Sequence, residues 1–315
     1  MKKIFAVIIA ALLFICAFCG CGNVQTEKQN GIKIVCTAFP QYDFAKNILG
    51  NVSGSVTLLT DNGADLHSYE PTAADIVEIG SADLFIYVGG VSDEWVDGII
   101  KSANKPKLKA LAIMDTVETL DEERISGMQH EHEHGHNHEV QKDEHVWLSL
   151  ENAAKITKAI CDKMCEADSE NASVYTANAN TYINKINALD TEYKKVIESA
   201  ERKVLLFADR FPFRYLTESY SLEYYAAFSG CSSESEASFE TMAFLIDKTK
   251  ELSLPVILII DGSDGSLAKT VSDATGAKIK TLDSCQSVSI TDIENGTDYL
   301  KIMASNLEVL KEALN

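Results

Sequence analysis

An uninterrupted amphipathic stretch, from about Ser169 to Ala200, constrains the fold of this 315-residue chain more than any other feature. Neither Pro nor Gly interrupts it, and apolar residues recur at spacings of three and four: Tyr175, Ala179, Tyr182, Ile186, Leu189, Tyr193 and Val196. This spacing predicts one long helix with a single apolar stripe. About 30 residues at ~1.5 Å each give a rod of roughly 45 Å, which suits a helix joining two lobes. A coiled-coil dimer is the competing interpretation.

Strands and helices alternate on both sides of this rod. Before it, we expect strands over 32–36, 55–59, 84–88 and near 108, and helices over 42–49, 72–80, 94–102 and 151–166. After it, we expect strands over 204–207, 223–228, 256–260 and 278–282, and helices over 212–220, 239–251, 268–275 and 296–313. Such alternation indicates parallel sheets flanked by helices. The predicted fold is therefore α/β, with lobes over 32–167 and 202–315 and a rigid linking helix over 168–201.

The beginning of the chain is predicted to be a targeting segment. Two lysines precede an apolar run over 4–18, which is too short for a comfortable membrane span, so residues 1–20 are interpreted as a signal peptide. Gly20 before Cys21 resembles a bacterial lipoprotein cleavage site. Cys21 would then carry a lipid, and 21–31 would form a tether. An ordinary secretory signal cleaved elsewhere is the alternative. Either way we expect an extracytoplasmic protein, and with the lipid one anchored to the membrane.

Charge and cysteine content limit the partners. The chain has 28 Lys and Arg against 47 Asp and Glu, a net charge of −19. That balance argues against a nucleic-acid partner, because such proteins neutralise phosphates with basic residues. Eight cysteines are present, but the five that follow Cys21 contain no Cys-x-x-Cys pair, and Cys16 and Cys19 lie within the predicted signal peptide, so a cysteine-rich structural zinc site is not predicted. Cys231 and Cys285 are expected either to form a disulfide or to be small buried apolar residues.

Five of the seven histidines alternate with other residues in one acidic segment: His130, His132, His134, His136 and His138. Neutral imidazoles are good ligands for zinc, copper and nickel. We therefore predict an auxiliary metal-binding loop within 115–144, the alternative being a fortuitous polar loop.

The remaining histidines lie in two compact local motifs. His67 follows a predicted strand and precedes a helix that starts near Pro71. His145 lies in the run Asp143-Glu144-His145-Val146-Trp147-Leu148, just ahead of another helix. A lone histidine in a loop is usually only solvated. Two of them in such motifs, beside a histidine-rich segment, are predicted to be metal ligands.

These two motifs resemble those of the zinc/manganese substrate-binding proteins of bacterial ABC importers. The segment from Gly63 to Asp75 is similar to the family pattern Gly-x-Asp-Pro-His-x-Tyr-x-Pro-x-x-x-Asp, with Leu66 in place of the first Pro. The segment around His145 is similar to Asp-Pro-His-x-Trp-Leu, with Glu144 in place of Pro. The resemblance spans nearly all of the chain after the targeting segment. It implies two α/β lobes joined by a rigid helix, with the metal in the cleft.

The resemblance also implies two ligands from the second lobe. The family takes one from the strand that opens this lobe, where this chain has no histidine. Asp209 is the expected substitute and Glu236 the fallback, while a helix N-cap is the other possible role of Asp209. The fourth ligand is expected to be Asp283, unless it is only a turn residue. Two imidazoles and two carboxylates can surround one divalent ion.

The function implied by the resemblance is high-affinity capture of Zn²⁺ for an ABC permease and its ATPase. The histidine-rich segment favours zinc, whereas a pair of carboxylates favours harder ions, so Mn²⁺ is the alternative. A metal-binding surface adhesin is a second alternative. A metallohydrolase is disfavoured, because the His-Glu-x-x-His matches, at His130–His134 and His132–His136, lie in the polar histidine-rich segment and not in a predicted helix. We expect a monomeric protein that is not an enzyme.

Overall fold

The computed structural model of this protein describes residues 31–60, 66–102, 108–129, 141–232 and 236–315. The predicted signal peptide, the lipidation site Cys21 and the five alternating histidines lie outside the described residues. Residues Gly31–Asn315 form one compact unit. Of the helices in the described ranges, none has the length and apolar character needed to cross a membrane.

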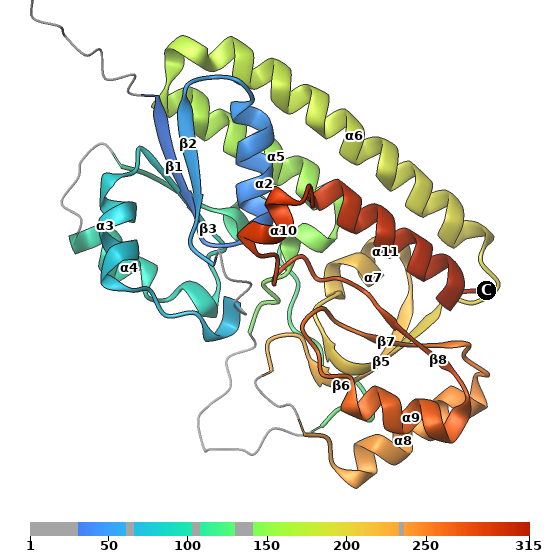
Figure 1. The fold of residues 1–315 in the computed structure, drawn as a ribbon. Helices are drawn as coiled ribbons and strands as arrows, with labels where there is room; N and C mark the ends of the chain where they lie inside the picture. Colours follow the sequence, from blue (N-terminus) through green and yellow to red (C-terminus); the bar gives the residue numbers. More distant parts are fainter. Residues whose placement is uncertain (1–30, 61–65, 103–107, 130–140, 233–235) are drawn as a thin grey trace, which may run out of the picture. The chain divides into compact units, whose positions relative to one another are not determined.

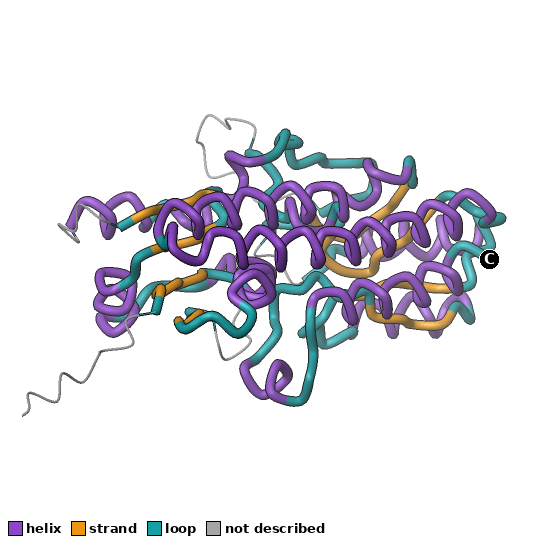
Figure 2. The backbone as a smooth tube through the Cα atoms, turned by 90° about the horizontal axis from the view of Figure 1, so that it is seen from above, coloured by secondary structure: helices purple, strands orange, loops and turns teal. Residues whose placement is uncertain are grey.

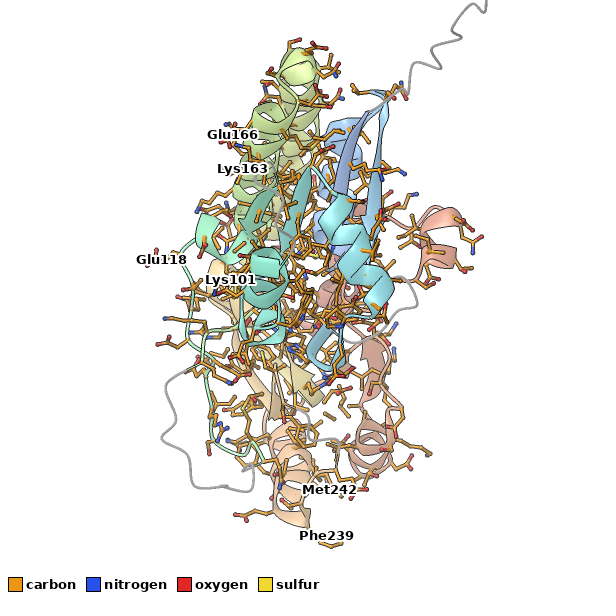
Figure 3. All side chains as sticks on the ribbon, turned by 90° about the vertical axis from the view of Figure 1, so that its left-hand side faces the viewer. Lys101, Glu118, Lys163, Glu166, Phe239 and Met242 are labelled. Carbon is orange, nitrogen blue, oxygen red and sulfur yellow. The ribbon has the colours of Figure 1, made fainter. Side chains whose placement is uncertain are left out.

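The first lobe is built on a four-stranded parallel sheet in the order β2-β1-β3-β4. The strands are β1 (Ile32–Cys36), β2 (Gly54–Leu58), β3 (Leu84–Tyr87) and β4 (Lys109–Ala112). The helices are α2 (Phe39–Leu49), α3 (Ala73–Ser81), α4 (Val96–Ser102) and α5 (Leu150–Ala167). Figure 1 shows α3 and α4 on one face of the sheet and α2 and α5 on the other. The outer face of α5 is charged, with an ion pair of 3.0 Å between Lys163 and Glu166 (Figure 3).

The second lobe repeats this topology. Its parallel sheet has the order β6-β5-β7-β8, so β2 and β6 occupy equivalent edge positions. The strands are β5 (Val204–Phe211), β6 (Glu223–Ser229), β7 (Val256–Ile259) and β8 (Lys278–Thr281). The helices are α7 (Arg214–Tyr220), α8 (Phe239–Glu251), α9 (Ser266–Thr275), α10 (Ile290–Glu294) and α11 (Tyr299–Ala313). The predicted α/β fold with two parallel sheets is confirmed.

Helix α6 (Ala172–Ser199) is the predicted linking helix. Its 28 residues span about 42 Å at ~1.5 Å per residue. It packs on α2 and α5 of the first lobe and on α11 of the second, and its far end lies next to the end of the chain (Figures 1 and 2). Most of the predicted apolar stripe is buried, including Tyr175, Tyr182 and Tyr193. The helix is therefore stabilised by packing along its whole length.

One apolar core continues through both lobes beneath α6. It includes residues of both sheets and of the helices that cover them, among them Ile34, Leu84, Trp147, Tyr193, Phe207 and Leu310. Smaller clusters lie under α3 and α4 and under α8 and α9. The two lobes thus share buried surface, which couples their stability.

Two differences from the predicted boundaries have a clear physical cause. The closing helix, expected over 296–313, begins only at Tyr299, because Gly296 adopts a φ of 92° and Asp298 caps α11 by accepting a hydrogen bond from the Lys301 amide. The short helix α10 before it was not predicted. Strand β5 continues past residue 207 to Phe211, with a register shift against β6 between Phe207 and Arg210. Pairing with β6 is a tertiary interaction that residues 208–211 do not signal locally.

A buried carboxylate joins α2 to α6 and makes stability depend on pH. Asp43 accepts hydrogen bonds from the Tyr182 hydroxyl at 2.5 Å and from Asn47 at 3.2 Å. Burial raises the pKa of Asp43 to about 6, although the Tyr182 hydrogen bond opposes the rise. Between about pH 4 and pH 6 the folded state therefore holds a proton that the unfolded state has released. The free energy of unfolding should fall by about 3 kcal/mol as pH rises through this window.

We expect Asp43→Asn to remove most of this pH-dependent loss, because an amide does not ionise. Urea unfolding at pH 4, 5, 6 and 7 measures it. Asp97→Asn, which changes a side chain that is 78% exposed, is the matched control. An unchanged pH slope in Asp43→Asn would contradict this account of the buried carboxylate.

Candidate metal centre

Two imidazoles from distant parts of the first lobe face each other. His67 lies in a 3-10 turn (Leu66–Ser68) that follows β2, and His145 directly precedes another (Val146–Leu148) ahead of α5. Their Nε2 atoms are 3.2 Å apart. Two nitrogens bound to one tetrahedral zinc at ~2.05 Å would be about 3.3 Å apart. The observed spacing of the two nitrogens therefore fits a shared zinc ion.

Hydrogen bonds orient both rings so that Nε2 is available. Asp143 Oδ1 accepts from the backbone amide of His145 at 2.9 Å and lies 3.1 Å from Nδ1 of the same residue. Ser92 Oγ lies 2.9 Å from Nδ1 of His67. A partner at Nδ1 fixes the ring of a metal-binding histidine and directs Nε2 to the ion. Without metal, a proton on one Nε2 is needed for the contact between the two rings.

The electrostatics around the pair favour a cation. Burial acts to lower the pKa of His145, but Asp143 and Glu144 outweigh it, and the pKa is raised above its ordinary value. Glu144 is itself buried, and its Oε2, 3.8 Å from Nδ1 of His67, accepts no hydrogen bond within the described part of the chain. Gly90 makes room for it, because a Cβ there would lie 2.3 Å from Glu144 Oε1. The buried carboxylates therefore make this site attractive to positive charge.

The segment carrying His145 is bound to the second lobe. The Tyr215 hydroxyl donates to the backbone carbonyl of Asp143 at 2.9 Å. The indole of Trp147 donates to the carbonyl of Ser284 at 2.9 Å, and the Tyr299 hydroxyl donates to the carbonyl of Trp147 at 2.6 Å. These contacts hold His145 where the two lobes meet.

Cys231 of the second lobe lies beside the two histidines. It follows β6, and its Sγ belongs to a group in which the ligand atoms of His67, His145 and Cys231 all lie within 4.8 Å of one another. Within the part of the chain that the structure describes, this is the one such group of three metal-binding side chains. A cavity of about 330 Å³ opens beside it, lined by residues that include His67, Ser92, Gln141, Glu144 and Cys231.

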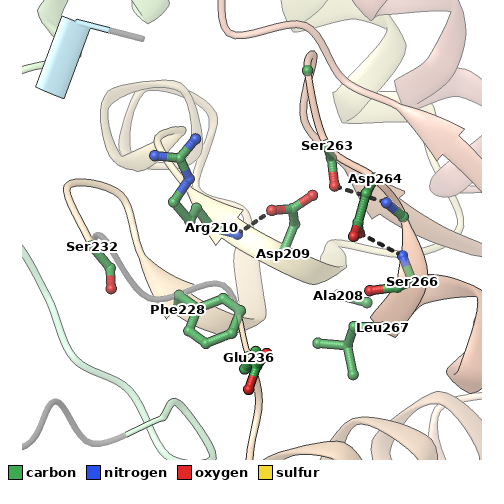
Figure 4. A pocket seen from close by; sticks show the side chains of 12 residues that line it. Ala208, Asp209, Arg210, Phe228, Ser232, Glu236, Ser263, Asp264, Ser266 and Leu267 are labelled. Carbon is green, nitrogen blue, oxygen red and sulfur yellow. Dashed lines mark hydrogen bonds between the residues drawn. The ribbon is translucent and has the colours of Figure 1, made fainter. Parts of the chain in front are cut away.

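Asp209 and Glu236, the predicted third ligand and its fallback, are not in this group. Both line a different cavity of about 440 Å³ at the end of β5 (Figure 4). At the irregular point of β5, the Asp209 carboxylate accepts from the backbone amides of Arg210 at 2.8 Å and Ile260 at 3.3 Å. The carboxylate therefore links β5 to the residue that follows β7. It does not cap a helix, the alternative role considered for Asp209, because α7 begins only at Arg214.

Asp283, the predicted fourth ligand, also lies outside the group. Its Oδ1 accepts from the Cys285 amide at 2.8 Å, and its backbone pairs with the Asn306 side chain of α11. Burial and the nearby Asp261 raise the pKa of Asp283 to about 7. The structure therefore brings two of the four predicted ligands together, and the two carboxylates lie outside their group of ligand atoms.

The disulfide considered between Cys231 and Cys285 is not formed. Both are free cysteines, and Cys285 is fully buried. Cys285 is thus the small apolar core residue of the alternative expectation. Sequence reasoning missed Cys231 as a neighbour of the histidines. The available signal was topological, because His67 follows the edge strand of one lobe and Cys231 follows the equivalent strand of the other.

Comparison with known proteins places the chain in a family. Residues 34–313 match the family of zinc-uptake complex component A, periplasmic. The high-affinity zinc uptake system protein ZnuA of Bacillus subtilis is 33% identical, over 96% of this chain and 97% of that protein. The zinc-binding lipoprotein AdcA of Streptococcus pneumoniae is 31% identical over 99% of this chain, which spans only 61% of that longer protein.

Solved structures agree with this assignment. The Zn(II)-bound ZnuA-like domain of S. pneumoniae AdcA superposes with a TM-score of 0.74 at 28% identity, covering 90% of this chain and 98% of that domain. The resemblance predicted from the His67 and His145 motifs is thereby confirmed. This chain belongs to the family of periplasmic zinc-uptake complex component A.

Proposed function

We propose that this protein captures one Zn²⁺ ion outside the cytoplasm and delivers it to an ABC importer. The observation that carries the proposal is the 3.2 Å approach of the Nε2 atoms of His67 and His145. Each ring is oriented through Nδ1, and the two Nε2 atoms have the spacing of nitrogens bound to one zinc ion.

The relatives support zinc as the cargo. The Bacillus protein is named for high-affinity zinc uptake and the streptococcal one for zinc binding. Manganese was the alternative because two carboxylates were expected as ligands, yet neither Asp209 nor Asp283 belongs to the group around the histidines. These observations favour Zn²⁺ over Mn²⁺ as the cargo.

The remaining parts of the proposal concern partners and location. A membrane permease and a cytoplasmic ATPase would receive and transport the ion, and a lipid on Cys21 would keep the protein at the outer side of the membrane. A lipid anchor agrees with the lipoprotein named among the relatives. Because the protein binds and releases its cargo unchanged, we propose a transport component and not an enzyme.

Elemental analysis of the purified chain tests the proposal. We expect one tightly bound zinc per chain, retained when residues 130–140 are deleted and lost in His67→Ala. The deletion is the matched control, because it removes five of the seven histidines but neither member of the facing pair. Retention of the ion in His67→Ala, or its loss on deletion of the loop, would count against the proposed site.

A further inference from the structure

We propose that the thiolate of Cys231 is the third protein ligand of the bound ion and the residue that selects zinc over manganese. This inference rests on the proposed function and names the determinant of its specificity. It departs from the carboxylate expected at this position.

The geometry of the group supports the assignment. The Sγ of Cys231 and the ligand nitrogens of His67 and His145 all lie within 4.8 Å of one another. In a tetrahedral site with Zn–S of ~2.3 Å and Zn–N of ~2.05 Å, the sulfur would lie about 3.6 Å from each nitrogen. Closing the largest separation allowed by that limit requires a movement of roughly 1 Å, which a residue at a strand end can make.

Backbone packing and hydrogen bonds place Cys231 beside the histidines. Gly230 packs against the ring of His145, because a Cβ on Gly230 would lie 3.3 Å from Cε1 of that ring and 2.8 Å from the carbonyl of Phe211. The amide of Cys231 donates to Glu122 at 2.8 Å, which ties it to the segment leading out of the first lobe. That segment is in turn bound to β6, since the Gln129 amide donates to the carbonyl of Ala227.

The other candidate ligands do not belong to this group. The carboxylates of Asp209 and Asp283 accept backbone hydrogen bonds inside the second lobe, and Glu236 is exposed beside the other cavity. Glu144 lies on the Nδ1 side of His67, opposite the nitrogen that faces His145. Among the described side chains of the second lobe, Cys231 is the one that shares a group of ligand atoms within 4.8 Å with both histidines.

The chemistry of a thiolate explains how Cys231 would select zinc over manganese. On binding, the Sγ–H bond breaks, its proton passes to solvent, and a zinc–sulfur bond forms without any change in oxidation state. Thiolate is a soft ligand that favours zinc and cobalt, whereas Mn²⁺ favours carboxylate, carbonyl and water oxygens. A His₂Cys set therefore binds Zn²⁺ well and discriminates against Mn²⁺.

Cobalt(II) replaces zinc in such sites and reports its ligands by absorption. We would titrate CoCl₂ into the full chain and into Cys231→Ser, His67→Ala and Cys165→Ser. Cys165 is the matched control, because it is another half-buried free cysteine, located in α5. We expect wild type and Cys165→Ser to show a thiolate-to-cobalt charge-transfer band in the near ultraviolet. Cys231→Ser should lose this band and bind zinc at least about 100-fold more weakly, beyond the effect of losing an outer hydrogen bond.

A second variant tests selectivity. Cys231→Asp replaces the soft ligand with a hard one, so we expect the ratio of zinc to manganese affinity to fall at least about tenfold. Urea unfolding of each metal-free variant shows whether it is folded. The assignment is overturned if Cys231→Ser keeps the charge-transfer band, or if wild type binds cobalt in a His67-dependent way without one. If wild type binds neither cobalt nor zinc stoichiometrically, the proposed function itself fails.

Discussion

Replacing His145 with asparagine is expected to weaken zinc binding by about 100- to 1,000-fold. Zinc bound by four ligands contributes about 10–16 kcal/mol, or roughly 3–4 kcal/mol for each ligand, and each ~1.4 kcal/mol is a factor of ten. Asparagine is the informative choice, because its amide nitrogen can take the place of Nδ1 and keep the hydrogen bond to Asp143. Only the Nε2 atom that faces His67 is lost.

Competition with a fluorescent zinc chelator measures this affinity. Unfolding of the metal-free variant in urea provides the control for stability, because His145 is fully buried and its truncation leaves a small void. An affinity within about threefold of wild type in a folded His145→Asn variant would remove His145 from the ligand set.

Replacing Trp147 with alanine is expected to cost about 3–5 kcal/mol of unfolding free energy. The side chain is fully buried in the core shared by both lobes. Its indole bonds to the carbonyl of Ser284 in the second lobe, and its ring packs edge-on against His145 with centroids 5.6 Å apart. Loss of the ring therefore removes core packing and a link between the lobes, and it frees the His145 ring. Zinc affinity should fall together with stability.

The chain offers a matched control, because it contains only one other tryptophan. Trp95 packs in the smaller cluster under α3 and α4, where its ring neighbours are Tyr69 and Phe85. Trp95→Ala should lower both stability and zinc affinity less than Trp147→Ala. Urea unfolding and zinc competition on both variants give the comparison. Equal losses of zinc affinity in the two variants would show that Trp147 has no specific role at the site.

Local patterns in the sequence were sufficient for most elements of the fold. The spacing of apolar residues predicted α6, and short β-branched runs between turn residues predicted the strands, because helix and strand periodicity follow from backbone geometry alone. The predicted boundaries were wrong where pairing between strands decides the end of an element. Residues 208–211 belong to β5 because β6 provides partners for Arg210 and Phe211, and no local pattern signals that extension.

The sequence by itself determined the two α/β lobes, the helix that joins them, and the local motifs that present His67 and His145. These depend on interactions between residues close in the chain or on side-chain chemistry. Only the tertiary structure decided which groups of the second lobe reach the pair. The carboxylates of Asp209 and Asp283 accept hydrogen bonds from backbone amides within that lobe. The close packing of Gly230 against His145 places the next residue, Cys231, beside the histidine pair. Such proximity depends on how two folded lobes meet, which spacing along one chain does not encode.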